Sequence, residues 1–173
     1  VGLNGQEFEM LKLRTMVEGS DPVGVGTVVT RDDPRVTAAG RVLRRTSLDE
    51  IPNLLNVLRG EMAIVGPRPT IPAQVKDYTP RQNRRHEVLP GITGLAQVNL
   101  PPDTDLDSVR RKIVLDCEYI KTASLLLDLR LILSTLLRCF GLRGGRAVSI
   151  LGLTRQVVLS IETAPIGGLP GSV

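Results

Sequence analysis

Two adjacent carboxylates among arginines are the residues of this sequence whose types and spacing best suit chemistry. Asp49 and Glu50 follow a basic segment, RVLRRTS, and precede Gly66-Pro67-Arg68-Pro69. Carboxylates can hold a divalent cation or attack phosphorus, and arginines grip phosphate through forked hydrogen bonds. The same residue types would also form an ordinary salt-bridged surface. Both interpretations are open at this level: phosphate-ester chemistry and a charged surface.

The local sequence places the two acids at the start of a helix. Ser47-Leu48-Asp49-Glu50 has the spacing of a capping box, in which Glu50 returns to the Ser47 amide and does no chemistry. Pro52 disturbs this register because a proline beyond the first turn removes a helix hydrogen bond. In either register we expect Asp49 in the first turn, where free amides and the helix dipole favour an ionised carboxylate. Such a carboxylate can attack phosphorus without first losing a proton.

The segment after the acids predicts a helix, a strand and a stiff turn. Apolar residues at 54–58 give the helix one apolar side, and Gly60 is expected to end it. The apolar run at 62–65 is expected to be a strand. The flanking prolines fix the backbone on both sides of Arg68, so its guanidinium would project from a rigid loop. The alternative is a plain turn with an exposed arginine.

Residues 1–16 predict a β-hairpin that carries two further cations. Asn4-Gly5 is a strong turn signal because both residues tolerate positive φ. Lys12 and Arg14 alternate with apolar residues, so they would share one face of the second strand, either toward a site or toward solvent. Residues 17–36 are rich in Gly, Asp, Pro and Thr and predict a loop. A short helix through Val42 and Leu43 is expected to follow.

The middle of the chain predicts more helix. Residues 71–88 are expected to form a helix with three arginines and His86, the sole histidine. A lone histidine is more often structural than catalytic. Residues 90–98 hold too much Gly and Pro for a helix and are expected to end in a short strand. A further helix is expected over residues 107–122.

The strongest helical pattern covers residues 125–140. Leu127 and Leu131 fall on the polar side of this pattern. Composition alone favours a core helix, and a helix lying at a membrane interface is the alternative. At 3.6 residues per turn, one broad apolar face collects Leu125, Leu126, Leu129, Ile132, Leu133, Leu136, Leu137 and Phe140.

Composition narrows the classes of partner. Aromatic residues make up 2% of the chain and Trp is absent, so Leu, Ile and Val must build the core. A net charge of +4 and a pI near 9.5 favour anionic partners. Nucleic acid fits poorly, because single-strand binders stack bases on aromatic side chains. Cys117 and Cys139 have no close-spaced partner, which predicts reduced thiols in a cytosolic compartment.

Four segments together resemble the bacterial sugar transferases, the monotopic phosphoglycosyl transferases that start polysaccharide and glycan assembly on a polyprenol carrier. They are KLRTM at 12–16, LRRTSLDEIPNLLNVLRGEMAIVGPRP at 43–69, RRHEVLPGITGLAQVN at 84–99, and an Asp-x-x-Tyr at 116–119 followed by SLLLDL. Several long motifs in order are a specific signal. We therefore expect a catalytic domain at residues 1–140 and an extension of unknown role at 141–173.

The resemblance implies a reaction and a set of site residues. A sugar 1-phosphate would pass from a nucleotide diphosphate sugar, usually a UDP-sugar, to undecaprenyl phosphate with release of UMP. Mg²⁺ and a covalent aspartyl-phosphosugar intermediate are implied as well. By motif position Asp49 would be the nucleophile and a metal neighbour, and Glu50 would be its partner as metal ligand or acid–base group. Arg44 and Arg68 would hold phosphates. The residues lining the site would be Lys12, Arg14 and His86.

The sequence also departs from the family pattern. Family members open with an apolar membrane-embedded segment, which we expect this chain to lack. Residues 100–102 read Leu-Pro-Pro where Gly-Arg-Asn is common, so an arginine near the substrate is missing. The resemblance makes the apolar face at 125–140 as well suited to a membrane as to a core.

The sequence thus predicts an α+β fold that is mainly helical, with a small N-terminal β-hairpin and amphipathic helices suited to a membrane interface. We expect it on the cytoplasmic face of the bacterial inner membrane. The expected partners are a nucleotide diphosphate sugar, a polyprenyl phosphate and the membrane surface, without nucleic acid and with a homo-oligomer left open. The alternative function is a non-catalytic basic module that binds anionic lipid or nucleic acid.

Overall fold

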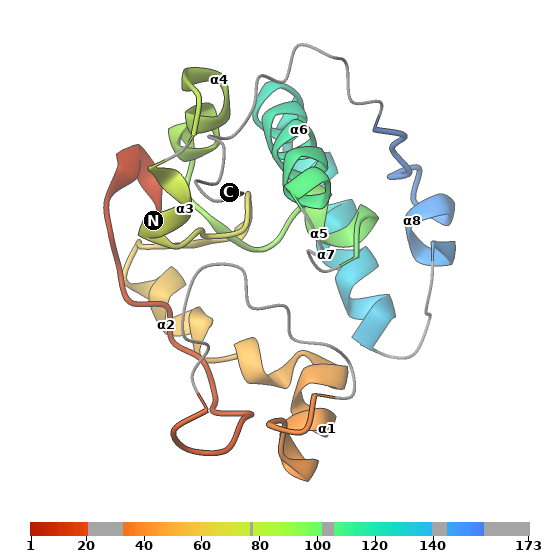
Figure 1. The fold of residues 1–173 in the computed structure, drawn as a ribbon. Helices are drawn as coiled ribbons and strands as arrows, with labels where there is room; N and C mark the ends of the chain where they lie inside the picture. Colours follow the sequence, from red (N-terminus) through yellow and green to blue (C-terminus); the bar gives the residue numbers. More distant parts are fainter. Residues whose placement is uncertain (21–32, 77, 102–105, 140–144, 158–173) are drawn as a thin grey trace, which may run out of the picture.

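The computed structural model describes residues 1–20, 33–76, 78–101, 106–139 and 145–157. Within these ranges, short helices surround one pair of parallel strands, and two longer helices, α6 (Leu106–Thr122) and α7 (Leu125–Cys139), lie together on one side (Figure 1). The expected fold class, α+β and mainly helical, is confirmed. The helices predicted at 107–122 and 125–140 are both present.

The parallel strands bring the segments Gly66-Pro67 and Pro90-Gly91 together. β1 (Ala63–Val65) pairs with β2 (Gly91–Thr93), with Ala63 opposite Gly91 and Val65 opposite Thr93. A Cβ atom on Gly91 would clash with the backbone of Gly66. The two segments of backbone can therefore approach this closely only because both residues are glycine. This contact fixes where the loop that carries Arg68 leaves the sheet.

The core is built mainly of aliphatic residues, as the low aromatic content predicts. Helix α5 (Leu95–Asn99) packs against α6 and α7, and α8 (Arg146–Ile150) packs against α7. Residues 145–157 lie past the expected boundary at residue 140, yet they supply part of this core. The buried cluster comprises Val65, Leu95, Ala96, Val98, Leu115, Tyr119, Leu131, Val148 and Leu153.

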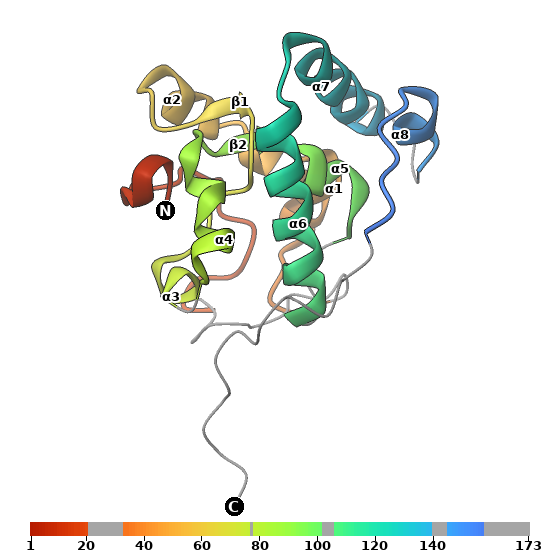
Figure 2. The ribbon, with the colours of Figure 1, turned by 90° about the horizontal axis from the view of Figure 1, so that it is seen from above.

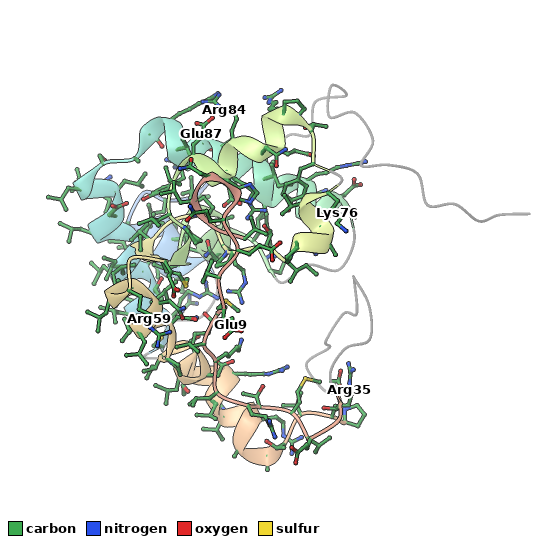
Figure 3. All side chains as sticks on the ribbon, turned by 90° about the vertical axis from the view of Figure 1, so that its left-hand side faces the viewer. Glu9, Arg35, Arg59, Lys76, Arg84 and Glu87 are labelled. Carbon is green, nitrogen blue, oxygen red and sulfur yellow. The ribbon has the colours of Figure 1, made fainter. Side chains whose placement is uncertain are left out.

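The expected N-terminal hairpin is wrong, although its turn residues behave as predicted. Asn4 and Gly5 have positive φ of 53° and 77°, but they belong to a 3₁₀ turn, η1 (Leu3–Gly5). The residues after this turn run along α2 (Asn53–Leu58) rather than back along residues 1–3. Figure 3 labels Glu9, which belongs to this segment. Buried Asn56 holds it there by accepting from the Leu11 amide and donating to the Glu9 carbonyl. Most of the loop expected at 17–36 lies outside the described residues.

The helix expected after Ser47 is also rearranged. Helix α1 (Ala38–Thr46) forms as predicted, capped by the Thr37 side chain. Ser47 adopts a left-handed conformation, with φ of 58°, and ends that helix instead of starting the next. The acids lie in a 3₁₀ turn, η2 (Leu48–Glu50), which gives way to α2 at Asn53. The predicted capping box is therefore wrong, and Glu50 is free for other contacts.

Residues 71–98 fold into shorter elements than predicted. The single helix expected over 71–88 is three pieces: α3 (Pro72–Val75), α4 (Pro80–Asn83) and η3 (Arg84–Glu87). Pro80 starts a new helix because its fixed φ suits the first helical position, and Thr79 caps that helix. The prediction for residues 90–98 is wrong in two respects, because the strand β2 stands at the start of the segment and a helix, α5 (Leu95–Asn99), forms where none was expected.

Helix α7 packs its narrower face on the core, so the core interpretation is wrong for most of the broad apolar face and the membrane-interface alternative stays a prediction. Leu131 and Ser134 are fully buried and Leu127 packs on the core. Most of the broad apolar face is exposed, with Leu125 at 76%, although Ile132 packs against the core. Phe140 lies outside the described residues. No helix in the described part of the chain is long and apolar enough to span a bilayer.

Exposed leucines also lie on neighbouring elements. Strand β1 contacts both α2 and α7, and Figure 2 shows the three along one edge of the molecule. We call the exposed large apolar side chains of these elements the apolar surface: Leu54, Leu55, Leu58, Ile64, Leu125, Leu126, Leu129, Leu133 and Leu136. A patch of this kind on one side of a small protein marks a contact with a membrane or another apolar partner.

Candidate active site

Two carboxylates and two cations meet where three segments of the chain come together. The Lys12 ammonium lies 3.0 Å from Asp49 Oδ2 and 3.3 Å from Glu50 Oε1. An Arg68 guanidinium nitrogen lies 2.9 Å from the same Glu50 oxygen. We call these four residues the carboxylate cluster. The structure thus joins four of the site residues named from the sequence.

The cluster is buried at one end and open at the other. The Asp49 side chain is 4% exposed, whereas those of Lys12 and Arg68 are 33% and 43% exposed. An anionic substrate would therefore meet the two cations first and the Asp49 carboxylate behind them. Cations in this arrangement attract phosphate.

The backbone explains how residues distant in sequence meet here. The Leu13 amide donates to the Asp49 carbonyl at 2.9 Å, which holds the extended N-terminal segment beside the turn with the acids. Lys12 precedes this contact, and Asn56 fixes the same segment two residues earlier. The acids lie in a sharp 3₁₀ turn that begins directly after Ser47, the residue that ends α1 in a left-handed conformation.

The Glu50 carboxylate interacts electrostatically with both Arg68 and Lys12. Burial alone would raise the pKa of the Glu50 carboxyl, but the Arg68 guanidinium and the Lys12 ammonium more than offset burial and hold the pKa below its usual value. Glu50 is therefore an anion at neutral pH. In this ionisation state it can ligate a cation or accept a proton, and it cannot act as a general acid without first being protonated.

A buried ion pair supports Arg68 from below. The Arg85 guanidinium donates to the Arg68 carbonyl and lies 2.8 Å from Asp116 Oδ2. Arg85 is 5% exposed and Asp116 2%, so the pair is shielded from solvent. Arg85 also donates to the Tyr78 hydroxyl at 3.0 Å. The sequence argument missed this support, although Asp116 belongs to one of the matching motifs.

Tyr119, the other end of that motif, has a structural contact of its own. Its hydroxyl donates to Asp128 at 2.9 Å and lies 3.4 Å from the Val65 carbonyl, joining α6, α7 and β1. Burial and then the Asp128 carboxylate raise the pKa of Tyr119. The motif thus has one residue behind the site and one in the core.

Three other residues predicted from the sequence to belong to the site have other partners than the carboxylate cluster in the described contacts. Arg44 donates to the Thr15 hydroxyl at 2.8 Å, and Arg14 pairs with Glu18 in solvent. His86 stacks on Tyr78 with ring centroids 6.2 Å apart. Burial, and then nearby Arg85, lower the pKa of His86. Their roles toward a substrate stay predictions.

The donor set of the cluster suits a hard cation that is shared with a substrate. Asp49 and Glu50 provide carboxylate oxygens, the ligands Mg²⁺ prefers, and Mg²⁺ often takes only one or two from the protein and the rest from phosphates and water. Among the described residues no group of three or more His, Cys, Asp or Glu could hold a metal alone. The Lys12 ammonium already places a positive charge against both carboxylates.

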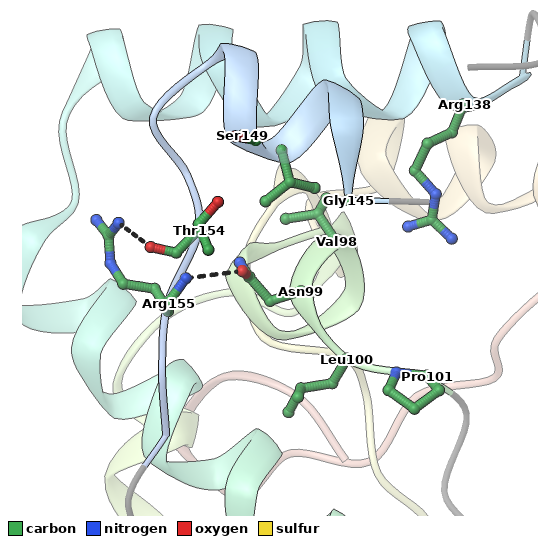
Figure 4. A pocket seen from close by; sticks show the side chains of 10 residues that line it. Val98, Asn99, Leu100, Pro101, Arg138, Gly145, Ser149, Thr154 and Arg155 are labelled. Carbon is green, nitrogen blue, oxygen red and sulfur yellow. Dashed lines mark hydrogen bonds between the residues drawn. The ribbon is translucent and has the colours of Figure 1, made fainter. Parts of the chain in front are cut away.

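Two of the cavities on the described surface lie near residues discussed above. One, of about 170 Å³, has Arg68 in its wall and continues between α3 and α6. The other, of about 470 Å³, lies between α5 and α8. Figure 4 shows the second cavity, with Arg138 at one end and Arg155 at the other, where the Arg155 amide donates to Asn99. Only the first shares a residue with the carboxylate cluster.

Comparison with known proteins gives one consistent result. A family model described as bacterial sugar transferase matches residues 1–141. The chain is 42% identical over 134 residues to the uncharacterized sugar transferase EpsL of Bacillus subtilis, covering 78% of this chain and 63% of that protein.

Two relatives carry more specific names. The chain is 46% identical over 139 residues to a UDP-glucose:undecaprenyl-phosphate glucose-1-phosphate transferase of Caulobacter vibrioides, covering 78% of this chain and 52% of that protein. It is 42% identical over 147 residues to the Escherichia coli protein of the same name, covering 80% of this chain and 31% of that protein. The chain therefore spans only part of the length of these relatives.

Proposed function

This chain belongs to the bacterial sugar transferase family, and on that premise we propose that it moves a sugar 1-phosphate from a nucleotide diphosphate sugar to a polyprenyl phosphate. The observation that carries the proposal is the carboxylate cluster. It sets a buried Asp49 beside Glu50 and behind two cations, Lys12 and Arg68. The relatives' names support a UDP-sugar as donor and undecaprenyl phosphate as acceptor.

The first displacement forms a bond between an Asp49 carboxylate oxygen and the phosphorus that bears the sugar. The bond from that phosphorus to the bridging oxygen breaks, and the nucleoside monophosphate, UMP for a UDP-sugar, leaves with that oxygen and its electron pair. Lys12 and Arg68 reduce the repulsion between the carboxylate and the diphosphate, since both lie within ion-pair distance of the carboxylates.

The second displacement regenerates the enzyme. A phosphate oxygen of the polyprenyl phosphate attacks the phosphorus of the aspartyl-phosphosugar, and the bond from phosphorus to Asp49 breaks. The product is a polyprenyl diphosphate sugar, and Asp49 leaves as a free carboxylate. Splitting the transfer in two means that donor and acceptor need not occupy the site together.

We also propose that Asp49 and Glu50 hold Mg²⁺ together with the donor. Bound there, the ion would neutralise charge on the diphosphate during transfer. The carboxylates of Asp49 and Glu50 would be the ligands this chain supplies, and Arg68 would bind substrate phosphate.

The membrane surface is the proposed location of the reaction, on its cytoplasmic face. A polyprenyl phosphate is anchored in lipid, so the protein must reach the interface. The apolar surface on α2, β1 and α7 supports this placement, because its leucines are exposed in the folded chain. The net charge of +4 would strengthen contact with anionic lipid.

The decisive experiment compares the wild type with Asp49→Asn. Each protein is mixed with Mg²⁺ and a panel of UDP-sugars, UMP release is measured, and intact-protein mass is read in parallel. We expect a mass increase equal to one phosphosugar in the wild type and none in the variant. Full UMP release by Asp49→Asn would refute the assignment of Asp49 as the nucleophile. Folded wild-type protein that releases no UMP with any donor would favour a binding module.

A further inference from the structure

The smaller cavity is joined to the carboxylate cluster through one side chain. Arg68, Pro69 and Thr70 form one wall of this cavity of about 170 Å³. The Arg68 guanidinium itself reaches Glu50 at 2.9 Å. A molecule in the cavity would therefore lie next to whatever phosphate Arg68 holds, at the edge of the cluster.

The lining suits a flat heterocycle better than a sugar. Tyr78 forms one wall, with His86 stacked on its ring and the Arg85 guanidinium carbon 5.9 Å from its centroid. Ile71 and Val109 add aliphatic surface. Aromatic and aliphatic walls match the faces of a nucleobase, whereas a sugar ring needs hydrogen-bond partners around its edge.

The polar groups of the cavity are few and of suitable type. Gln74 offers an amide, which has both a donor and an acceptor and can pair with the imide edge of a base such as uracil. Lys112 on α6 also lines the cavity and adds a positive charge to that of Arg68. A nucleotide carries these two features together, a base edge and a phosphate.

The walls are held in place before any ligand arrives. Buried Arg85 binds the Tyr78 hydroxyl and the Arg68 carbonyl, and it pairs with Asp116 on α6. One side chain thus ties together the aromatic wall, the arginine loop and the helix opposite. A preformed cavity loses less entropy on binding than one that must order its walls.

We propose that this cavity binds the nucleoside monophosphate portion of the donor, with the base against Tyr78 and Gln74 and the phosphate toward Arg68 and Lys112. The sugar phosphate would then point from Arg68 toward Asp49. This assignment rests on the proposed function, and it adds where the leaving group sits and which residues select it.

The test measures equilibrium binding of UMP by calorimetry, without acceptor or turnover. Val109→Trp fills the cavity and Gln74→Ala removes its amide. Thr154→Trp, an exposed position in the cavity between α5 and α8, is the matched control. We expect Val109→Trp to weaken UMP binding by about tenfold or more, Gln74→Ala to weaken it less, and Thr154→Trp to leave it unchanged. Glucose 1-phosphate should bind equally well to all four proteins.

Several results would overturn the assignment. One is UMP binding that Val109→Trp and Gln74→Ala leave within twofold of the wild type, and another is wild-type protein that UMP does not saturate. Weakening by Thr154→Trp to the same extent would also overturn it. Circular dichroism checks folding, and Gln74→Ala decides alone if Val109→Trp unfolds. The mass experiment on Asp49→Asn is independent, so UMP binding can fail while the phosphosugar adduct forms, and the reverse.

Discussion

At the scale of single residues, two neighbouring acids have different surroundings. Asp49 is almost fully buried and contacts Lys12, whereas Glu50 is less buried and contacts both Lys12 and Arg68. The difference follows from the 3₁₀ turn, which points successive side chains in different directions. A buried carboxylate with one cation in front of it suits a nucleophile, and one held between two cations suits a ligand or base.

Lys12 is expected to matter for catalysis because it opposes both carboxylates at once. Lys12→Met removes the ammonium and keeps a chain of similar length. We expect UMP release at saturating Mg²⁺ to fall on the order of 10²-fold, as for loss of one preorganised charge-stabilising donor. Lys12→Arg should recover part of the rate.

The control for this change is Lys121→Met, an exposed lysine near the end of α6. It removes one positive charge from the chain without touching the carboxylate cluster. A Lys12→Met enzyme whose rate stays within twofold of the control would show that the ammonium seen against Asp49 takes no part in the reaction.

At the scale of elements, two leucines of α7 test which face of this helix packs in the core. Leu131→Ala removes a side chain that is fully buried, and Leu129→Ala removes one that is exposed on the same helix. We expect Leu131→Ala to lower the free energy of unfolding by about 2–5 kcal/mol and Leu129→Ala to change it by less than about 0.5 kcal/mol. Denaturant unfolding of the two variants measures both.

The two leucines are a matched pair because helix propensity and the deleted atoms are the same. Equal losses of stability would mean that the broad leucine face packs in the core after all. A larger loss for Leu129→Ala would place the core on the face that the sequence pattern predicted.

The outcome on α7 shows why periodicity predicts a helix more securely than its orientation. The leucine spacing gave the bounds of α7 to within a residue. Both faces carry leucine, however, and two polar residues on the inner face have partners: Thr135 contacts Thr93 of β2, and Asp128 accepts from Tyr119. Sequence patterns count polarity and cannot know which polar groups will be satisfied inside.

The candidate site, too, could be predicted from the sequence only in part. Asp49, Glu50, Arg68 and Lys12 were named from residue types and motif likeness, and the structure brings them together. Their support was not predictable, because Arg85 and Asp116 meet only through the packing of η3 on α6. Glu50 was assigned a capping role as the alternative, and a left-handed Ser47, which no local rule favours, removed that role.

At the scale of the whole molecule, the apolar surface allows a test of the proposed membrane contact. Leu58 and Leu126 lie on α2 and α7 and are 83% and 59% exposed. We expect Leu58→Gln combined with Leu126→Gln to weaken binding to phosphatidylethanolamine–phosphatidylglycerol vesicles by about tenfold or more, because buried apolar area drives interfacial binding. Vesicle co-sedimentation measures the change.

Val42→Gln is the control, since Val42 is 60% exposed on α1 and outside the apolar surface. It should bind vesicles as the wild type does. Equal binding of the double variant and the wild type would remove the apolar surface from the proposed mode of membrane contact, while leaving the proposed chemistry at Asp49 untouched.

The assembly of the carboxylate cluster from distant segments also bears on how the chain folds. Lys12, Asp49 and Arg68, with Arg85 and Asp116 behind them, meet only after long stretches of chain have closed, and each closure has an entropic cost that local helices avoid. Such contacts form late and open early. Partial unfolding should therefore abolish phosphosugar formation while most helical signal remains, which makes turnover a more sensitive report of native structure than circular dichroism.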